Sequence, residues 1–335
     1  MDAATPLIDP FGREITDLRV SITDRCNFRC TYCMPEEGMH WLDRGELLSF
    51  EEITRIARVM ATAFRLQSVR ITGGEPTVRA QVPSLIEQLA QVRRPDGTGL
   101  ELSMTTNGAT FALLADDLVS AGLARVNISL DTLRPERFAQ ITRRTRLERV
   151  IEGIDAAIRV GLSPVKLNTV VMRGVNEDEL PDLVHFAVDR GIEVRFIEFM
   201  PLDGDGHWSP RDVVSEAEML ELLAAHFSFH PLARSSAPAT TYELDDGSGR
   251  FGVIPTVTHP FCDACDRVRL SADGRLRTCL FALDEHDLRP LLRGGAGDDA
   301  LAERIVAIVG TKWAGHQIGT VRFRRPSKSM SQIGG

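Results

Sequence analysis

The stretch LRVSITDRCNFRCTYC, residues 18–33, joins a short apolar strand pattern to a polar loop that carries three cysteines. Cys26, Cys30 and Cys33 form a C-x3-C-x2-C group. In parallel α/β folds, active sites gather at the carboxyl ends of strands, which is where such a loop would lie. A structural zinc site needs four protein ligands, whereas three cysteines on a four-iron cluster leave one iron open to another molecule. This stretch therefore predicts an α/β fold with a metal centre after its first strand.

The same strand pattern recurs through the first 200 residues. Strands are predicted at 18–22, 69–72, 102–105, 126–130, 165–171 and 194–199, and helices at 50–64, 83–91, 111–121, 147–160 and 177–190. Ser49 and Glu52 form a capping box, Gly122 and Gly161 suit helix C-termini, and Pro181 suits a first helical turn. Strands that alternate with helices favour parallel pairing with right-handed crossovers. We predict a partial (β/α)6 TIM-like barrel, with a doubly wound open sheet as the alternative.

The pattern changes near residue 232, where Ser, Ala and Pro become frequent at 233–239. We therefore predict a core domain at 10–232 and a C-terminal extension at 233–335 that carries a second cysteine group and ends in an extended segment. The net charge of −8 and the pI of about 5.6 argue against general nucleic-acid binding. No apolar run approaches ~20 residues and no signal peptide is recognisable, so we expect a cytoplasmic protein with reduced thiols.

The second cysteine group is Cys262, Cys265 and Cys279, a C-x2-C-x13-C pattern. Asp273-Gly274 is a strong hairpin signal between the second and third cysteines, and a hairpin would return Cys279 to the other two. Zinc remains an alternative at both groups, with His40 as a fourth ligand at the first and His259 at the second.

Residues 26–33, CNFRCTYC, closely resemble the signature of the radical S-adenosylmethionine superfamily. The resemblance implies a [4Fe-4S] cluster whose open iron binds S-adenosylmethionine and reduces it to a 5′-deoxyadenosyl radical. Residues 73–76, GGEP, resemble the loop that contacts the methionine group of this cofactor. By the same resemblance, the residues that hold it are Tyr32, Gly74, Ser129 and Met200.

The pattern F-C-x2-C-x-R-x-R-L at 261–270, with MSQIGG at 330–335, resembles the GTP 3′,8-cyclases of molybdenum-cofactor biosynthesis, the MoaA family, over nearly the whole chain. The resemblance implies that the open iron of a second [4Fe-4S] cluster binds guanine and that the Gly-Gly tail threads toward the active site. Asp266 stands where this family more often has Asn, and we expect its carboxylate to face the loop backbone. The implied GTP-binding residues are Arg19, Arg70, Thr105, Lys166, Arg267, Val268 and Arg269.

The function that this resemblance implies is conversion of GTP into (8S)-3′,8-cyclo-7,8-dihydroguanosine 5′-triphosphate. The radical would take hydrogen from ribose C3′, and C3′ would then attack purine C8. The implied partners are a reduced electron donor such as flavodoxin and the downstream cyclic pyranopterin monophosphate synthase, and a homodimer is compatible with the pattern. Two alternatives remain at this point: a radical enzyme that modifies peptides and carries an auxiliary cluster, and a zinc-stabilised binding module for RNA or protein.

Overall fold

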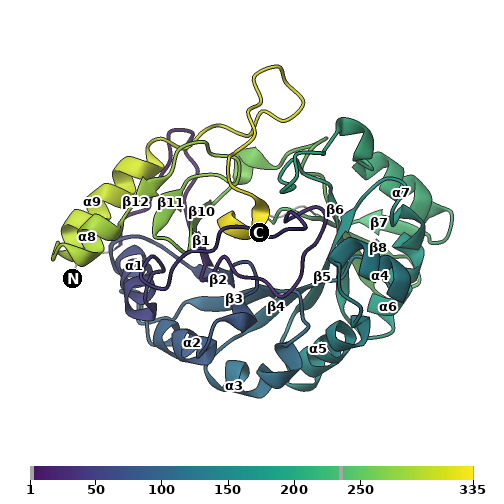
Figure 1. The fold of residues 1–335 in the computed structure, drawn as a ribbon, viewed down its shortest axis with the longest axis horizontal. Coiled ribbons are helices and arrows are strands. Elements are labelled where there is room, and N and C mark those ends of the chain that lie inside the picture. Colours follow the sequence, from purple (N-terminus) through teal and green to yellow (C-terminus); the bar gives the residue numbers. More distant parts are fainter. Residues whose placement is uncertain (1–3, 234–236, 335) are drawn as a thin grey trace.

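The computed structural model describes residues 4–233 and 237–334 and contains a curved sheet with helices on its outer side (Figure 1). The six central strands are parallel and lie side by side in chain order. Their bounds are β1 (Asp17–Ser21), β2 (Ser68–Thr72), β3 (Glu101–Thr106), β4 (Arg125–Ser129), β5 (Val165–Val171) and β6 (Glu193–Glu198). The predicted partial barrel is confirmed.

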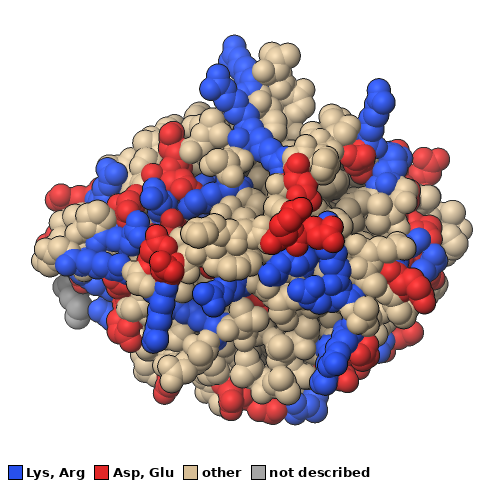
Figure 2. Space-filling view, in the orientation of Figure 1, with Lys and Arg blue, Asp and Glu red and all other residues tan. Residues whose placement is uncertain are grey.

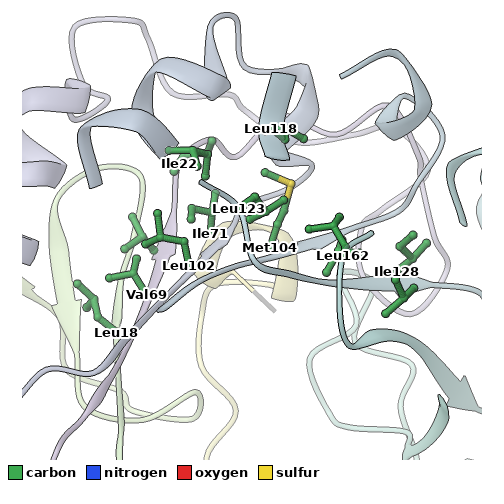
Figure 3. Close-up of a cluster of buried hydrophobic side chains, with 14 of the residues drawn as sticks. Leu18, Ile22, Val69, Ile71, Leu102, Met104, Leu118, Leu123, Ile128 and Leu162 are labelled. Carbon is green, nitrogen blue, oxygen red and sulfur yellow. The ribbon is translucent and has the colours of Figure 1, made fainter. Parts of the chain in front are cut away.

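The strands alternate apolar and polar side chains, and the two kinds face opposite sides of the sheet. In β2, Val69 and Ile71 are fully buried under the helices, whereas Ser68, Arg70 and Thr72 line a cavity on the inner face. Figure 3 shows part of the outer layer, in which Leu18, Val69, Ile71, Leu102 and Met104 belong to one buried cluster with Leu118 of a covering helix. An apolar outer face stabilises the barrel by burial, and this leaves the inner face free to carry polar groups.

The outer helices agree with the predicted ones at most boundaries. The capping box of Ser49 and Glu52 opens α1, and Pro181 lies in the first turn of α6. Two predicted helices were too long. Residues 111–121 form a 3₁₀ turn, η2 (Phe111–Leu113), and then α3, and residues 177–190 form η3 (Glu177–Glu179) and then α6. The helix bounds are α1 (Phe50–Ala63), α2 (Val82–Ala90), α3 (Ala115–Ser120), α5 (Leu147–Arg159) and α6 (Leu180–Val188), with α4 (Pro135–Thr142) not predicted.

The C-terminal third extends the same sheet at both edges. β9 (Arg250–Ile254) pairs parallel to β6, and β10 (Arg267–Leu270) pairs parallel to β1. Because β10 and β11 (Arg275–Arg277) form an antiparallel hairpin around Gly274, the hairpin prediction is confirmed. The other strands are β7 (Phe229–Pro231), β8 (Thr240–Leu244) and β12 (His286–Asp287).

Four further α-helices follow β6 in the described residues. They are α7 (Glu216–Ala224), α8 (Arg289–Arg293), α9 (Asp298–Val309) and α10 (Met330–Ile333). The tail from residue 323 was predicted to be extended, and residues 323–329 indeed contain no helix or strand. The prediction was wrong for Met330–Ile333, which form α10 with a capping box between Ser329 and Gln332. Figure 1 shows this yellow segment over the middle of the ring of strands. Gly335 lies outside the described residues, as do residues 234–236 of the predicted linker, and the domain boundary at 232 stays a prediction.

None of the helices in the described ranges combines the length and the apolarity that crossing a bilayer requires.

Candidate active site

The first triad, Cys26, Cys30 and Cys33, lies on the loop that follows β1 and lines the inner cavity. The Cys26 thiol accepts hydrogen bonds from the Phe28 amide, at 3.3 Å, and from the Asn107 side chain, at 3.8 Å. Burial, together with the negative charge of Glu75, raises the pKa of Cys26 to about 11. Burial also raises the pKa of Cys33 to about 12 and that of Cys30 well above its ordinary value. A metal that binds these thiols must displace their protons.

The carboxylate of Glu75 fixes the loops around this triad. It is 1% exposed and accepts hydrogen bonds from the Thr77 amide (3.0 Å), the hydroxyls of Thr77 (2.6 Å) and Thr106 (2.7 Å), and the Asn107 amide (2.6 Å). These bonds tie the turn after β2 to the end of β3. Sequence analysis noted Glu75 only within the GGEP motif and gave it no role.

Gly74 has no room for a side chain, because a Cβ there would lie 2.5 Å from the carbonyl oxygens of both Asp24 and Arg25. Its amide donates to the Thr23 carbonyl at 2.7 Å, so its own carbonyl is the backbone group that remains for a ligand. The reason for the glycine is therefore the close approach of the cysteine loop.

Three other residues predicted to contact the cofactor line the same cavity: Tyr32, Ser129 and Met200. The Tyr32 hydroxyl donates to the carboxylate of Asp131 at 2.8 Å, and Asp131 also accepts from the Val170 amide at 2.9 Å. Burial raises the pKa of Asp131 to about 6. Asp131 thus connects the triad loop to the ends of β4 and β5.

The second triad, Cys262, Cys265 and Cys279, lines a smaller adjoining cavity of about 80 Å³. Burial alone would raise the pKa of Cys265, but the positive charges of Arg267 and Lys312 lower it below its ordinary value. The two cavities share Met200, Thr256, Phe261, Arg267, Arg269 and Leu280. The main cavity, of about 750 Å³, therefore runs from one triad to the edge of the other.

The structure does not support His40 or His259 as the fourth ligand of a zinc site. His259 is largely exposed and pairs with Glu216 at 3.3 Å, and His40 is exposed to solvent. In the described part of the chain, no group of three or more His, Cys, Asp or Glu side chains, the two cysteine triads included, is arranged to hold a single metal ion. Each triad has thiol donors only, and thiolates are the usual ligands of iron–sulfur clusters.

Between the triads, cations line the cavity. Arg19, Arg70, Lys166, Arg267 and Arg269 all face it, together with Thr105. Burial and the neighbouring positive charges, Arg267 then Arg70, lower the pKa of Arg19 to about 9, and burial lowers that of Arg70 to about 10. Within the described ranges, Nε of Arg19, Nε and Nη1 of Arg70 and Nη2 of Arg267 are buried and have no hydrogen-bond partner. Unpartnered buried donors of positive charge suit a polyanion.

Several cavity residues escaped the sequence analysis. Arg195 lies on β6 and pairs with Glu193 at 2.6 Å, and Glu193 also pairs with Lys166 at 3.2 Å. Arg125 lies at the start of β4 and pairs with Glu101. Each alternates with buried apolar residues in its strand, so the alternation that located Arg19 and Arg70 would have located these two arginines as well. Asn127 and Asn168 also line the cavity.

In the second cysteine segment, the structure limits how Val268 could contact a ligand and corrects the expected surroundings of Asp266. The Val268 side chain is fully buried in the hydrophobic core, because β10 turns it outward between Arg267 and Arg269. Only its backbone is left to contact a ligand. The Asp266 carboxylate meets side chains instead of the loop backbone: the Thr16 hydroxyl donates to it at 3.3 Å, and Nε of Arg267 lies 3.4 Å away. This pairing offsets its negative charge beside the cavity.

The C-terminal tail contacts the first triad and an arginine that lines the cavity of the second. Ser331 lines the main cavity and hydrogen-bonds to the Cys33 thiol, and Arg269 donates to the Gly334 carbonyl. Gly334 has a φ of +84°, and a Cβ there would lie 2.5 Å from the Thr72 hydroxyl. The predicted approach of the tail is therefore present up to Gly334. Over the face shown in Figure 2, blue basic and red acidic side chains are interspersed, and the basic groups of the cavity lie inside the barrel.

Two family models match the chain. The model described as the Radical SAM superfamily matches residues 20–187, and the model described as Molybdenum Cofactor Synthesis C matches residues 192–318. The first runs from the end of β1 through β5 and includes the first triad, and the second covers β6 to α9 with the second triad.

Curated relatives and solved structures agree with these models. The chain is 47% identical over 338 residues to the GTP 3′,8-cyclase of Streptomyces coelicolor, which covers 100% of this chain and 98% of the relative. It is 48% identical over 335 residues to the GTP 3′,8-cyclase of Rhodopirellula baltica, which covers 98% and 92%. The crystal structure of Streptococcus suis SuiB bound to S-adenosylmethionine has the same fold, with a TM-score of 0.59 and 16% identity over 88% of this chain and 68% of that one.

Proposed function

Because the chain belongs to the radical S-adenosylmethionine family of GTP 3′,8-cyclases, we propose that its cavity converts GTP into (8S)-3′,8-cyclo-7,8-dihydroguanosine 5′-triphosphate. The enzyme uses two [4Fe-4S] clusters and S-adenosylmethionine, and it acts in molybdenum-cofactor biosynthesis. The observation that carries this proposal is a pair of adjoining cavities, one at each cysteine triad, with buried, unpartnered arginine donors between the triads.

The first triad would hold the cluster next to S-adenosylmethionine, and together they supply the one-electron chemistry that removes hydrogen from C3′ of the ribose. Tyr32, the Gly74 carbonyl, Ser129 and Met200 would orient this cofactor, since all four residues line the wall near the triad. The buried Glu75 and Asp131 keep these loops in place through the hydrogen bonds described above.

The second triad would hold a cluster whose open position faces the guanine base. Arg267 and Arg269 stand where the two cavities meet, and Arg19, Arg70, Thr105 and Lys166 continue along the strands. These side chains would bind the ribose and the triphosphate, and the backbone of Val268 lies between the two arginines. Fixing the base at one end and the phosphates at the other keeps C3′ and C8 close enough to react before the radical is lost.

The remaining expectations about partners follow from the chemistry. One electron is needed for each cleavage, so we propose a reduced donor of the flavodoxin class, and the product requires a downstream synthase such as that for cyclic pyranopterin monophosphate. A homodimer is also part of this proposal. The six cysteines are free thiols, which suits a reducing compartment, and we therefore place the enzyme in the cytoplasm.

Isotope transfer tests the function. Anaerobic enzyme with reconstituted clusters, S-adenosylmethionine and a strong reductant is given GTP that carries deuterium at C3′. We expect deuterium in 5′-deoxyadenosine and a cyclised triphosphate in the mass spectrum. ATP labelled in the same way serves as the control. Unlabelled 5′-deoxyadenosine with unchanged GTP would contradict the proposal, and an added peptide modified under these conditions would favour the peptide-modifying alternative.

A further inference from the structure

The loop at residues 312–316, which follows α9, contacts the second triad, and sequence analysis gave it no role. Its first residue, Lys312, is one of only three lysines among 39 basic residues and is 3% exposed. The Lys312 ammonium lies 3.6 Å from the Cys265 sulfur and donates to the carbonyls of Arg267 and Thr278, each at 2.7 Å. An ammonium has three donors, so all three are used.

These contacts place Lys312 at two of the three cysteines. Cys265 is a direct partner, and Thr278 immediately precedes Cys279. The carbonyl of Arg267 belongs to β10, two residues after Cys265. One side chain therefore joins both ends of the β10–β11 hairpin to a thiol that would bind the cluster.

The rest of the loop encloses Cys262. A Cβ on Gly315 would lie 2.9 Å from the Cys262 Cβ and 3.1 Å from its sulfur, so this position has no room for a side chain. The His316 amide hydrogen-bonds to the Cys262 thiol. Arg13 holds the loop in place, because its guanidinium donates to the carbonyls of Cys262 (2.7 Å), Trp313 (2.5 Å) and Ala314 (2.6 Å).

A buried lysine requires compensation, because taking an ammonium out of water is costly unless it is hydrogen-bonded and paired with negative charge. Here the partners are two carbonyl oxygens and one sulfur. A cluster-bound cysteine is a thiolate, so it would supply the negative charge that this ammonium faces. In return, the ammonium would donate a hydrogen bond to the sulfur, and hydrogen bonds to ligand sulfurs and local charge set the reduction potential of a cluster.

We propose that Lys312 is a positioning residue for the second cluster: it holds Cys265 and Cys279 in the geometry of the triad and raises the reduction potential of that cluster. The proposal rests on the presence of the second cluster and does not depend on the identity of the substrate. The first cluster, in the same molecule, has no such lysine because the other two, Lys166 and Lys328, pair with carboxylates elsewhere.

The test is a redox titration of Lys312→Met, followed by electron paramagnetic resonance, with the first cluster as internal reference. Removing the positive charge should shift the second cluster to a more negative potential and leave the first unchanged. A chelator should also extract iron from the second cluster faster, so that protein with about eight iron atoms declines to about four. Lys328→Met removes the same charge next to Asp273 and Glu285 and should leave both clusters unchanged.

Two further variants keep the test decisive. Lys312→Arg retains the charge and should restore most of the potential, whereas Lys312→Gln retains a donor without the charge and should resemble Lys312→Met. If Lys312→Met does not fold, the Arg and Gln pair supplies the same comparison. Equal second-cluster potentials and equal iron retention in the wild type and in Lys312→Met or Lys312→Gln would overturn the proposal. A wild-type enzyme with only four iron atoms per chain would instead contradict the proposed function.

Discussion

The buried charged groups that act on the first triad are the carboxylates of Glu75 and Asp131, whereas those that act on Cys265 of the second are the cations Arg267 and Lys312. Both triads have three cysteines, yet their electrostatic surroundings have opposite signs. Negative surroundings disfavour an added electron, and positive surroundings favour it. The first site therefore suits a strong reductant, and the second suits an anionic nucleotide. The number of ligands alone would not have distinguished these roles.

The test with the largest expected effect removes one cluster at a time and asks whether the two clusters have separate roles. Cys30→Ala should abolish cleavage of S-adenosylmethionine, because the first cluster loses one of its three cysteine ligands. Cys265→Ala should still produce 5′-deoxyadenosine but no cyclised GTP. Chromatography of both products from the two variants measures this. Loss of both products in Cys265→Ala, in a folded protein that retains the first cluster, would show that the two sites are not separable.

The next test concerns the arginines at the junction. Arg267→Ala combined with Arg269→Ala removes two charged donors, each worth about 1.5–3 kcal/mol, and should weaken GTP binding about 100-fold or more. Equilibrium binding to the anaerobic enzyme measures it, with both clusters counted by iron analysis. Arg58→Ala, on the exposed side of α1, is the control. Unchanged GTP affinity in the double variant would place the triphosphate elsewhere.

A third test breaks the link between the triads. Gly334→Ala places a side chain where φ is +84° and where Thr72 lies 2.5 Å away. The strain is about 1–3 kcal/mol, so we expect about a tenfold slower cyclisation while both clusters remain. Gly295→Ala is a matched control, since Gly295 has a φ of +79° and nothing within 4 Å. Equal cyclisation rates in Gly334→Ala and Gly295→Ala would show that the position of the tail does not affect cyclisation.

The last test concerns stability instead of activity and measures a pH dependence at the first site. Burial raises the pKa of Asp131 from 3.8 to about 6. The folded state therefore favours the neutral acid, and this contribution to stability is full below pH 3.8 and is lost as the pH rises through about 6. It amounts to at most about 3 kcal/mol.

Asp131→Asn keeps an acceptor for the Val170 amide. It should remove this pH dependence from the free energy of unfolding, measured with urea between pH 4 and 7. Asp182→Asn, on the exposed start of α6, is the control. A slope that persists in Asp131→Asn would assign the pH dependence to another group.

The local sequence pattern was sufficient to predict much of the barrel. The strand β5 (Val165–Val171) matches its predicted bounds, and Ser49 and Pro181 mark helix starts as predicted. Where the prediction erred, long-range packing decided the outcome. The break at Leu114 between η2 and α3 carries no strong local signal, and α10 forms where the tail docks into the barrel. The helix α4 was missed although Pro135 marks its start, as Pro181 does for α6.

The sequence by itself determined the two cysteine triads, the alternation of apolar and polar residues in the strands, and the family, because ligand spacing and side-chain period are local properties of a chain. Only the tertiary structure decided that β9 and β10 extend the two edges of one sheet, that Glu75 and Asp131 surround one triad, and that Lys312 and Arg13 surround the other. Those partners are separated by tens to hundreds of residues, and the electrostatic environment of a site depends on distance in space.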